Sequence, residues 1–447
     1  MFSFVLRVSR LPVFDLNYVF CSEKQDLQEY YNLRLVARVP YVSCFIAYLK
    51  ILGKGVFLLF KRREERAFPK GGIVLFTHSG NNTACLEPIR KMYPDACWVG
   101  PPAYAPSGPS ISATAWVSLL FLPAFIWRWI RGTAYEKRSM AYAMDTTLLA
   151  YGYYVLSCLW LKKYAPRLVV FANDHSTFPR IFRAAALDQK FKTLYLQHAS
   201  VTSTFPPLDF DYACLDGQDS LDKYREAGDI KSTIFLTGMA KSAQLKDRIN
   251  NHEKVNSVGV CVNILDDLDQ IKSLILGVRE FSPDLPLVWR PHPAMASMFE
   301  SMQAWGDLNH IKFSNPKEES IWDFMDGIDL LLAGNSSVHV EATLLNITSV
   351  YIDSGGGRED VYGYVRAGLV DQYEGALFDK IAEFRECRPN VRHKAEYYCA
   401  DIGTTYEGRA DFLLAYALKM ILEDSVPRDV FEKVKSHDEI IYIPRRK

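Results

Sequence analysis

Short apolar runs that end in polar loops recur along most of the chain. In the first half these runs cover residues 73–76, 167–172, 193–196, 212–215 and 234–236. Stretches with helical periodicity follow several of them. Apolar runs of this length that alternate with helices are typical of parallel strands covered on both faces. The pattern predicts a doubly wound α/β lobe over residues 67–239.

The same pattern returns after a charged segment at residues 240–256, which we interpret as a linker. We expect a second α/β lobe over residues 257–425, followed by a tail at 426–447. The last helical stretch of that range, residues 411–422, could pack back across the first lobe. The apolar runs of the second lobe cover residues 257–263, 285–289, 311–313, 330–333 and 349–352.

Residues 1–66 are apolar, aromatic and basic, and we expect helices there. The runs 41–60 and 116–130 are too interrupted by Lys50, Lys54, Pro123 and Arg128 to give the ~18–20 apolar residues that span a bilayer. Basic residues beside Trp, Phe and Leu favour a helix lying on a membrane surface. The alternative is that both runs are buried core helices.

Composition narrows the functional classes. The formal net charge of zero over 447 residues provides no basic field for nucleic acid. Nine cysteines without a CxxC pair indicate reduced thiols. The first residues lack the features of a secretory signal. We therefore expect a cytoplasmic protein, peripheral on the inner face of the cell membrane.

One candidate site follows the run 330–333, in the segment Gly334-Asn335-Ser336-Ser337-Val338-His339-Val340-Glu341. Gly334 permits a sharp turn, and Ser336 or Ser337 then caps a helix whose free N–H groups favour a phosphate. Glu341 lies one turn beyond Ser337, where it can accept hydrogen bonds from a ribose. The alternative is a plain serine-capped helix.

A second candidate is Arg290-Pro291-His292-Pro293, at the end of the run 285–289. Two prolines hold the backbone around His292 rigid, which suits contact with a phosphate or leaving group. Arg290 adds a fixed positive charge. The alternative is a rigid strand exit with an exposed histidine. We expect His292 and Ser336-Ser337 to meet on one phosphate from neighbouring strands.

The order His292-Pro293, then Ser336-Ser337 with Glu341, resembles the donor lobe of GT-B glycosyltransferases. It is most similar to the bacterial inverting enzymes that use CMP-activated sugars, the sialyl-, polysialyl- and Kdo-transferases of capsule and lipopolysaccharide. The resemblance implies that Arg290, His292, Asn335, Ser336, Ser337 and Glu341 bind a nucleotide sugar, CMP-linked, as co-substrate without a cofactor. Gln197-His198 also resembles the CDP-glycerol glycerophosphotransferases.

The first lobe should supply the base that deprotonates the acceptor. Asp174, at one strand end, is our first candidate and His198, at the next, is the second. Asp174-His175-Ser176 can also be read as a helix N-cap. The resembled sialyltransferases have an acidic pair before a glycine, where this chain has Asp216 alone before Gly217. On the acceptor side we expect His78, Asn81, His175 and Arg180.

The sequence thus predicts an inverting, metal-independent glycosyltransferase that acts on a surface glycan or glycolipid. The acids Asp266, Asp267 and Asp269 are read as solvated rather than as a metal site. The alternatives are a CDP-glycerol-type polyol-phosphate transferase, a nucleotide-sugar 2-epimerase and an inactive scaffold.

Overall fold

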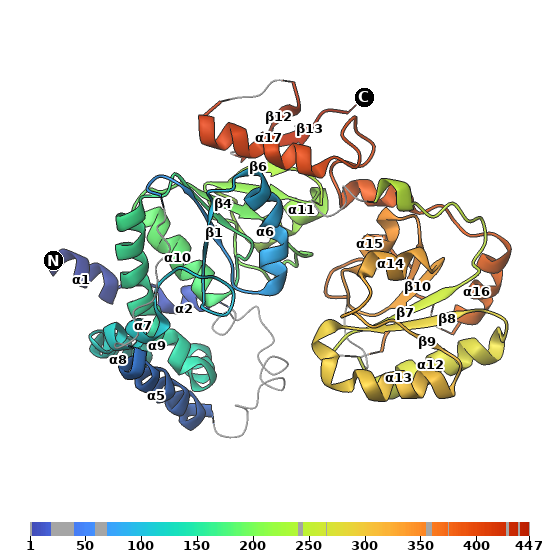
Figure 1. Ribbon diagram of the computed structural model, residues 1–447, viewed down its shortest axis with the longest axis horizontal. Helices are drawn as coiled ribbons and strands as arrows, with labels where there is room; N and C mark the ends of the chain where they lie inside the picture. The colour runs from blue at the N-terminus through green and yellow to red at the C-terminus, as the bar shows by residue number, and fades with distance from the viewer. Residues whose placement is uncertain are drawn as a thin grey trace.

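The computed structural model consists of two lobes, each built on its own sheet (Figure 1). It describes residues 2–18, 40–58, 69–239, 245–264, 266–354, 360–373, 375–425, 429–436 and 439–446. Parts of the predicted N-terminal region and of the predicted linker lie outside these residues. The two sheets confirm the predicted α/β class with two doubly wound lobes.

The first sheet has eight strands in the order β12-β13-β6-β5-β4-β3-β1-β2. Its six strands from the first half are parallel. Five are buried and form from the predicted apolar runs, and the sixth, β2, lies at the edge and is partly exposed. The six are β1 (Ile73–Phe76), β2 (Cys97–Val99), β3 (Leu168–Phe171), β4 (Thr193–Leu196), β5 (Tyr212–Leu215) and β6 (Thr233–Leu236). The helices α6 (Gly80–Met92), α10 (Thr177–Asp188) and α11 (Gln218–Ala227) follow β1, β3 and β5.

The C-terminal segment returns to this first lobe. α17 (Ala410–Glu423) packs its apolar side against α6 and β5, and Leu413 and Leu418 join one core cluster with Leu75 and Val170. β13 (Glu439–Pro444) then pairs parallel with β6, and β12 (Phe431–Ser436) pairs antiparallel with β13. The sequence placed the lobe boundary at residue 425 and the rest in a tail, although it allowed the helix at 411–422 to pack back across the first lobe, as α17 does. The open sheet edge at β6 and the uncovered sheet face draw both into the first lobe.

The second sheet has five parallel strands in the order β11-β10-β7-β8-β9. These are β7 (Val258–Val262), β8 (Leu287–Pro291), β9 (Lys312–Phe313), β10 (Leu330–Ala333) and β11 (Thr348–Tyr351). The helices that cover its faces are α12 (Leu268–Phe281), α13 (Phe299–Leu308), α14 (Ile321–Asp326), α15 (Val338–Leu344) and α16 (Leu377–Glu386). The carboxyl ends of parallel strands share one edge, so the polar loops meet there.

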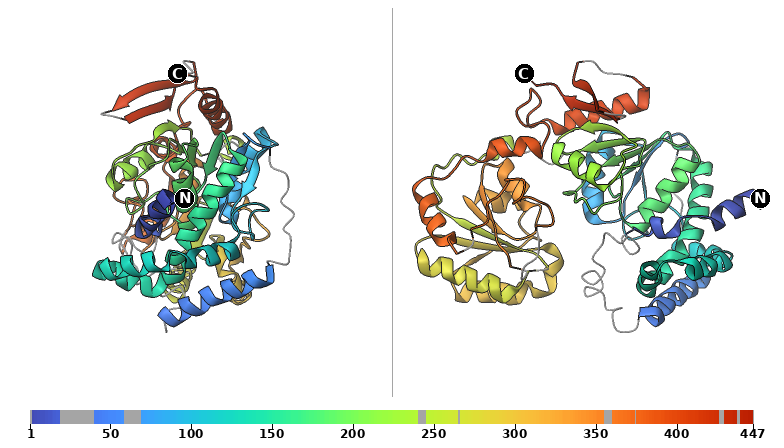
Figure 2. Two further views of the ribbon diagram at one scale, coloured as in Figure 1. Left: turned by 90° about the vertical axis from the view of Figure 1, so that its left-hand side faces the viewer. Right: turned by 180° about the vertical axis from the view of Figure 1, so that it is seen from behind.

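A helical unit lies at one end of the first lobe (Figures 1 and 2). We call α5 (Pro40–Leu58), α7 (Ile111–Leu119), α8 (Leu122–Arg131) and the long helix α9 (Ala134–Tyr164) that unit. α5 and α7 both pack on α9, and the Tyr48 hydroxyl on α5 donates a hydrogen bond to the Ala115 carbonyl on α7 at 2.7 Å. The short helices α1 (Phe2–Ser9) and α2 (Val13–Leu16) also contact α9.

Among the described helices, none is both long and apolar enough to cross a membrane alone. The pair α7 and α8, bent by 74° at their junction, meets the length and composition for a crossing together.

Gly152 on α9 is the point of closest approach to α7. Its N–H donates to the Ser118 hydroxyl at 3.0 Å, and a methyl group there would overlap that hydroxyl and the Thr114 carbonyl. We therefore expect Gly152→Ala to lower the free energy of unfolding by about 1–3 kcal/mol. Differential scanning calorimetry of the two proteins measures the loss.

The matched control is Gly80→Ala in α6, where nothing lies within 4 Å of the new methyl group. Alanine is favoured over glycine in a helix by about 0.5–1 kcal/mol, so this variant should be as stable as the parent or more so. Equal melting of both variants would contradict the packing of α7 on α9.

Candidate functional site

The second lobe gathers the predicted donor residues at the carboxyl edge of its sheet, on either side of β7. His292 follows β8, whereas Ser336 and Ser337 follow β10, and β7 separates these two strands. The prediction that they come from neighbouring strands is therefore wrong. Strands lie about 4.8 Å apart, so a phosphate that both clusters contact has to lie over the end of β7.

His292 is held in one orientation at the strand exit. Its backbone N–H donates to the Val262 carbonyl at 2.8 Å, and its ring Nδ1 accepts from the Ala294 N–H at 3.2 Å. Since Nδ1 accepts, the neutral ring carries its proton on Nε2. Residue 292 is exposed, so this Nε2–H is available as a donor.

The Ser336-Ser337 turn is arranged differently from the predicted cap. Ser337 occupies the N-cap position of α15 but makes no capping bond, whereas the Ser336 hydroxyl accepts from the Val338 N–H at 3.4 Å. Asn335 ties the turn to its surroundings. Its Nδ2 donates to the Tyr351 hydroxyl at 3.0 Å, and its carbonyl accepts from Asn263 at 2.7 Å.

Arg290 points into the second lobe. Its guanidinium donates to the Ser314 hydroxyl at 2.6 Å and to the Glu319 carbonyl at 2.8 Å, and burial lowers its pKa. Glu341 is buried as well, at 5% exposure, and its charge acts on Arg290. A phosphate contact through Arg290 would require these internal bonds to be exchanged.

His339 stabilises the turn from beneath. It is fully buried, its Nε2 bonds to the Gly334 carbonyl at 2.9 Å, and its Nδ1 bonds to the Ser349 hydroxyl. A carbonyl only accepts, so Nε2 carries the proton and the ring is neutral. Burial lowers the pKa of His339 to about 4.

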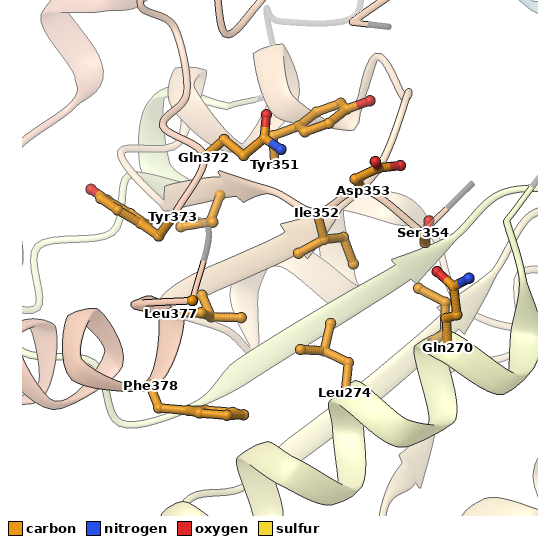
Figure 3. A pocket seen from close by; sticks show the side chains of 13 residues that line it. Gln270, Leu274, Tyr351, Ile352, Asp353, Ser354, Gln372, Tyr373, Leu377 and Phe378 are labelled. Carbon is orange, nitrogen blue, oxygen red and sulfur yellow. The ribbon is translucent and has the colours of Figure 1, made fainter. Parts of the chain in front are cut away.

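A pocket of about 380 Å³ adjoins this turn, between α12, the end of β11 and α16 (Figure 3). Leu274, Ile352, Leu377 and Phe378 supply its apolar lining. Its polar side chains are Gln270, Asp353, Ser354 and Gln372, and Tyr351 and Tyr373 also line it. Tyr351 is the residue that Asn335 holds, so the pocket opens next to the Ser336-Ser337 turn. Its size suits a small organic ligand.

The acidic loop after β7 is used internally. Asp267 caps α12 by accepting from the Asp269 and Gln270 N–H groups. Asp266 accepts from the Asn263 N–H at 2.6 Å and the Ser354 hydroxyl at 2.7 Å. Within the described ranges, no group of three or more His, Cys, Asp and Glu side chains is placed to hold a metal ion.

In the first lobe, Asp174 is a buried carboxylate with two partners. It is 2% exposed, its Oδ1 lies 2.9 Å from His175 Nδ1, and its Oδ2 accepts from the Tyr224 hydroxyl at 2.6 Å. Burial alone would raise the pKa of Asp174. The bonds from His175 and Tyr224 and the nearby charge of His198 outweigh burial, so this pKa is lowered and the group is anionic at neutral pH.

Asn173, and not Asp174, forms the turn that precedes α10. The Asn173 side-chain oxygen accepts from the Ser176 N–H at 2.8 Å, and so makes the turn into α10. With both carboxylate oxygens engaged below the surface, Asp174 is poorly placed to take a proton from a substrate. The geometry favours an orienting role for Asp174 over the predicted role as base.

His175 is the exposed member of this pair. An anionic Asp174 only accepts, so His175 Nδ1 carries the proton and Nε2 is left unprotonated. The side chain is 25% exposed, and its ring centroid lies 4.6 Å from that of Phe205. We call Asp174, His175 and Tyr224 the first-lobe triad.

The other predicted first-lobe residues lie around this triad. Burial and then the charge of His175 lower the pKa of His78, whose Nδ1 has no hydrogen-bond partner among the described residues. Asn81 is exposed in the first turn of α6. Arg180 is buried and donates to the Asp15 and Asp174 carbonyls, both at 3.0 Å. It therefore anchors α2 beside the triad and does not present its charge to solvent.

His198 lies in the loop after β4, which Gln197 shapes. Gln197 accepts from the Asp216 N–H at 2.9 Å and donates to the Ala199 carbonyl at 3.0 Å. The charge of His198 acts on Asp174, which places His198 beside the triad.

Hydrogen bonds connect the two clusters across the lobes. The Asn335 side-chain oxygen accepts from the Val361 N–H at 2.8 Å. Three residues further, the Tyr364 hydroxyl donates to Ser200 in the loop after β4 at 2.6 Å. The donor-side turn and the loop that carries His198 therefore face the same interlobe region.

Sequence reasoning missed Tyr224 and Asn263. Tyr224 lies within α11, where it reads as an ordinary core residue and no motif marks it. Asn263 ends the run 257–263, and its position at a strand end was the available signal.

Comparisons with known proteins bear on the fold. No family model matches the sequence, and no curated protein matches it. Among solved structures, a Listeria monocytogenes protein described as a UDP-N-acetylglucosamine 2-epimerase superposes with a TM-score of 0.53 at 12% identity, over 80% of this chain and 98% of its own. S. aureus MnaA, solved with UDP, superposes with a TM-score of 0.50 at 13% identity, over 80% of this chain and 99% of its own. The protein therefore has a GT-B-type fold of two Rossmann-like lobes.

The buried His339 predicts how stability depends on pH. The pKa of this group is about 4 in the folded protein and 6.5 in the unfolded chain, so between these values the unfolded chain binds more protons. Stability is present above pH 6.5 and is lost as the pH falls towards 4, by about 3 kcal/mol in all. Urea unfolding over this range measures the slope.

His339→Gln removes the titrating group and should flatten that slope, whereas the exposed His393→Gln should leave it unchanged. An unchanged slope in His339→Gln would show that the buried imidazole is not the cause.

Proposed function

We propose that the protein is a nucleotide-sugar-dependent glycosyltransferase in which His175, oriented by Asp174, is the catalytic base. The supporting observation is the first-lobe triad at the end of β3, with a buried carboxylate holding a partly exposed imidazole in the tautomer that accepts a proton at Nε2. A carboxylate–imidazole pair of this kind removes protons from hydroxyl groups near neutral pH.

The donor is proposed to lie along the carboxyl edge of the second sheet. Its nucleoside occupies the pocket of Figure 3, with Asp353 and Gln372 facing the ribose or base. Its phosphate lies over the end of β7, between the Ser336-Ser337 turn and His292. The CMP-linked donor is proposed from the resemblance of His292-Pro293 and Ser336-Ser337 to the enzymes that use such sugars.

The proposed reaction is a single displacement. The acceptor oxygen attacks the anomeric carbon, and His175 Nε2 takes the proton from that oxygen. The bond between the anomeric carbon and the phosphate oxygen breaks, and the nucleotide leaves with both electrons. The Nε2–H of His292 donates to the phosphate oxygen that gains charge, an electrostatic contribution to the transition state. Asp174 stabilises the imidazolium that forms on His175.

The acceptor is proposed to be a growing surface glycan or glycolipid. It would approach from the first lobe, where His78 lies close enough to His175 for the charge of one to act on the other.

The triad generates a graded kinetic prediction. His175→Ala removes the base and should lower kcat by roughly 10²–10⁴-fold without changing donor affinity, because His175 lies in the first lobe. Asp174→Asn should lower kcat by a similar order, because the variant lacks the carboxylate charge and no longer fixes the tautomer of His175. Tyr224→Phe removes one hydrogen bond and should cost about tenfold. Steady-state transfer assays with donor titrations measure each step.

His393→Ala, an exposed histidine of the second lobe, is the matched control and should retain full activity. An active His175→Ala protein would exclude His175 as base. If Asp174→Asn alone abolishes transfer, Asp174 is the base, as the sequence first suggested.

Donor choice is tested by thermal shift with CMP, CDP, UDP and GDP. We expect CMP to raise the melting temperature most, because the His292-Pro293 and Ser336-Ser337 motifs resemble those of enzymes that use CMP-linked sugars. A ligand at a hundred times its Kd adds about 2.7 kcal/mol to the stability of the folded state. His292→Ala should reduce this shift, and Gln303→Ala, exposed on α13, should not.

Incubation with the preferred donor then separates the alternatives. Transfer of sugar to an acceptor supports the proposal. Transfer of glycerol phosphate from CDP-glycerol, or epimerisation of a UDP-sugar without an acceptor, would contradict it.

A further inference from the structure

The helical unit exposes large apolar side chains on α5, on α8 and at the α7–α8 junction. α8 buries Phe125 against the protein, while Trp127 and Ile130 are 58% and 57% exposed. α5 buries Cys44 and Tyr48 one turn apart. The exposed apolar residues of the two helices and of the α7–α8 junction are Tyr41, Val42, Phe45, Ile46, Leu49, Trp116, Leu120, Leu122, Ile126, Trp127, Trp129 and Ile130. Monomeric soluble proteins seldom gather this much apolar surface without a partner.

The charge of the same surface has a single sign. α5 carries Lys50 and Lys54, and α8 carries Arg128 and Arg131, whereas α5, α7 and α8 contain no Asp or Glu. Glu136, at the start of α9, is engaged in a capping box with Thr133. Arg131 lies over the ring of Trp127, at 4.7 Å from its centroid.

This combination selects one kind of partner. Tryptophan and tyrosine side chains beside lysine and arginine are favoured at the boundary between lipid headgroups and acyl chains. Two copies of this chain paired through the surface would bring like charges together, which disfavours self-association. We propose that the outer face of α5 and α8 binds the surface of a bilayer that contains anionic lipids.

α7 remains part of the protein in this arrangement. Ser112, Thr114, Ala115 and Ser118 are buried against the neighbouring helices. α8 therefore lies along the membrane surface while α7 holds it to α9.

The surface is connected to the first-lobe triad. Arg128 on α8 donates to the Arg10 and Leu11 carbonyls, both at 3.2 Å. Asp15 lies a few residues after Leu11, and Arg180 donates a hydrogen bond to its carbonyl and another to that of Asp174 in the triad. The segment around α2 therefore links the helical unit to the triad. The binding surface itself stands without the proposed function, since it rests on exposure and charge alone.

Flotation of the full-length protein with vesicles tests the inference. We expect binding to vesicles of phosphatidylcholine mixed with phosphatidylglycerol, and weaker binding to phosphatidylcholine alone. Trp127→Ser with Ile130→Ser should lower the partition coefficient at least tenfold. Lys50→Gln, Lys54→Gln and Arg131→Gln together should remove the preference for phosphatidylglycerol, since each basic residue near such a surface contributes roughly fivefold. Added salt should weaken binding in the same direction.

The matched control is Leu308→Ser on α13 of the second lobe, an 81% exposed leucine outside this surface, which should bind as the parent does. All these side chains are exposed, and thermal unfolding checks that each variant folds. The proposal is overturned if the parent ignores phosphatidylglycerol vesicles, or if Leu308→Ser loses as much binding as the tryptophan variant. It is also overturned if the parent is an oligomer that does not bind vesicles and the tryptophan variant is a monomer, because the surface would then bind a second copy of the chain. Nucleotide thermal shifts, measured in parallel, report on the proposed function separately.

Discussion

The structure of the candidate site depends on one buried charge, the carboxylate of Asp174. A charge at 2% exposure is tolerated only when its oxygens are satisfied, and here His175 and Tyr224 satisfy them. These bonds determine the tautomer of His175, hold α11 against the end of β3, and leave Asn173 to make the turn into α10. Removing either partner would leave an uncompensated charge inside the lobe, so the local fold and the proposed chemistry rest on the same bonds.

A comparable arrangement supports the second lobe, with a neutral group in place of a charge. His339 is buried and neutral, and it bonds to the Gly334 carbonyl and the Ser349 hydroxyl. The Ser336-Ser337 turn therefore has a rigid base, and Asn335 extends from it towards Tyr351 and Val361. The contact between Tyr364 and Ser200 continues this chain of bonds to the first lobe. These bonds thus link the donor-side turn to the loop that carries His198.

The first lobe also organises both ends of the chain. α17 and β13 complete its sheet and core from the C-terminal side, and α1 and α2 contact α9 from the N-terminal side. Arg180 and Arg128 use carbonyl groups of the segment around α2 as acceptors, so the apolar helices and the triad share a common support. This arrangement explains why an arginine predicted to bind an acceptor is instead buried.

The sequence by itself determined the α/β class, most strand positions, and the placement of the polar clusters at strand ends, because apolar periodicity and turn residues act locally along the chain. It also identified His292 and the Ser336-Ser337 turn as polar groups at such ends, and Asp174-His175 as a unit. Only the tertiary structure decided that β7 separates His292 from Ser336, that Tyr224 completes the triad, that Arg290 and Arg180 face inward, and that the C-terminal segment joins the first sheet. Each of these depends on strand order or on partners far away in the chain, such as Ser314 for Arg290 and Asp15 for Arg180, and a local pattern carries no information about such distant contacts.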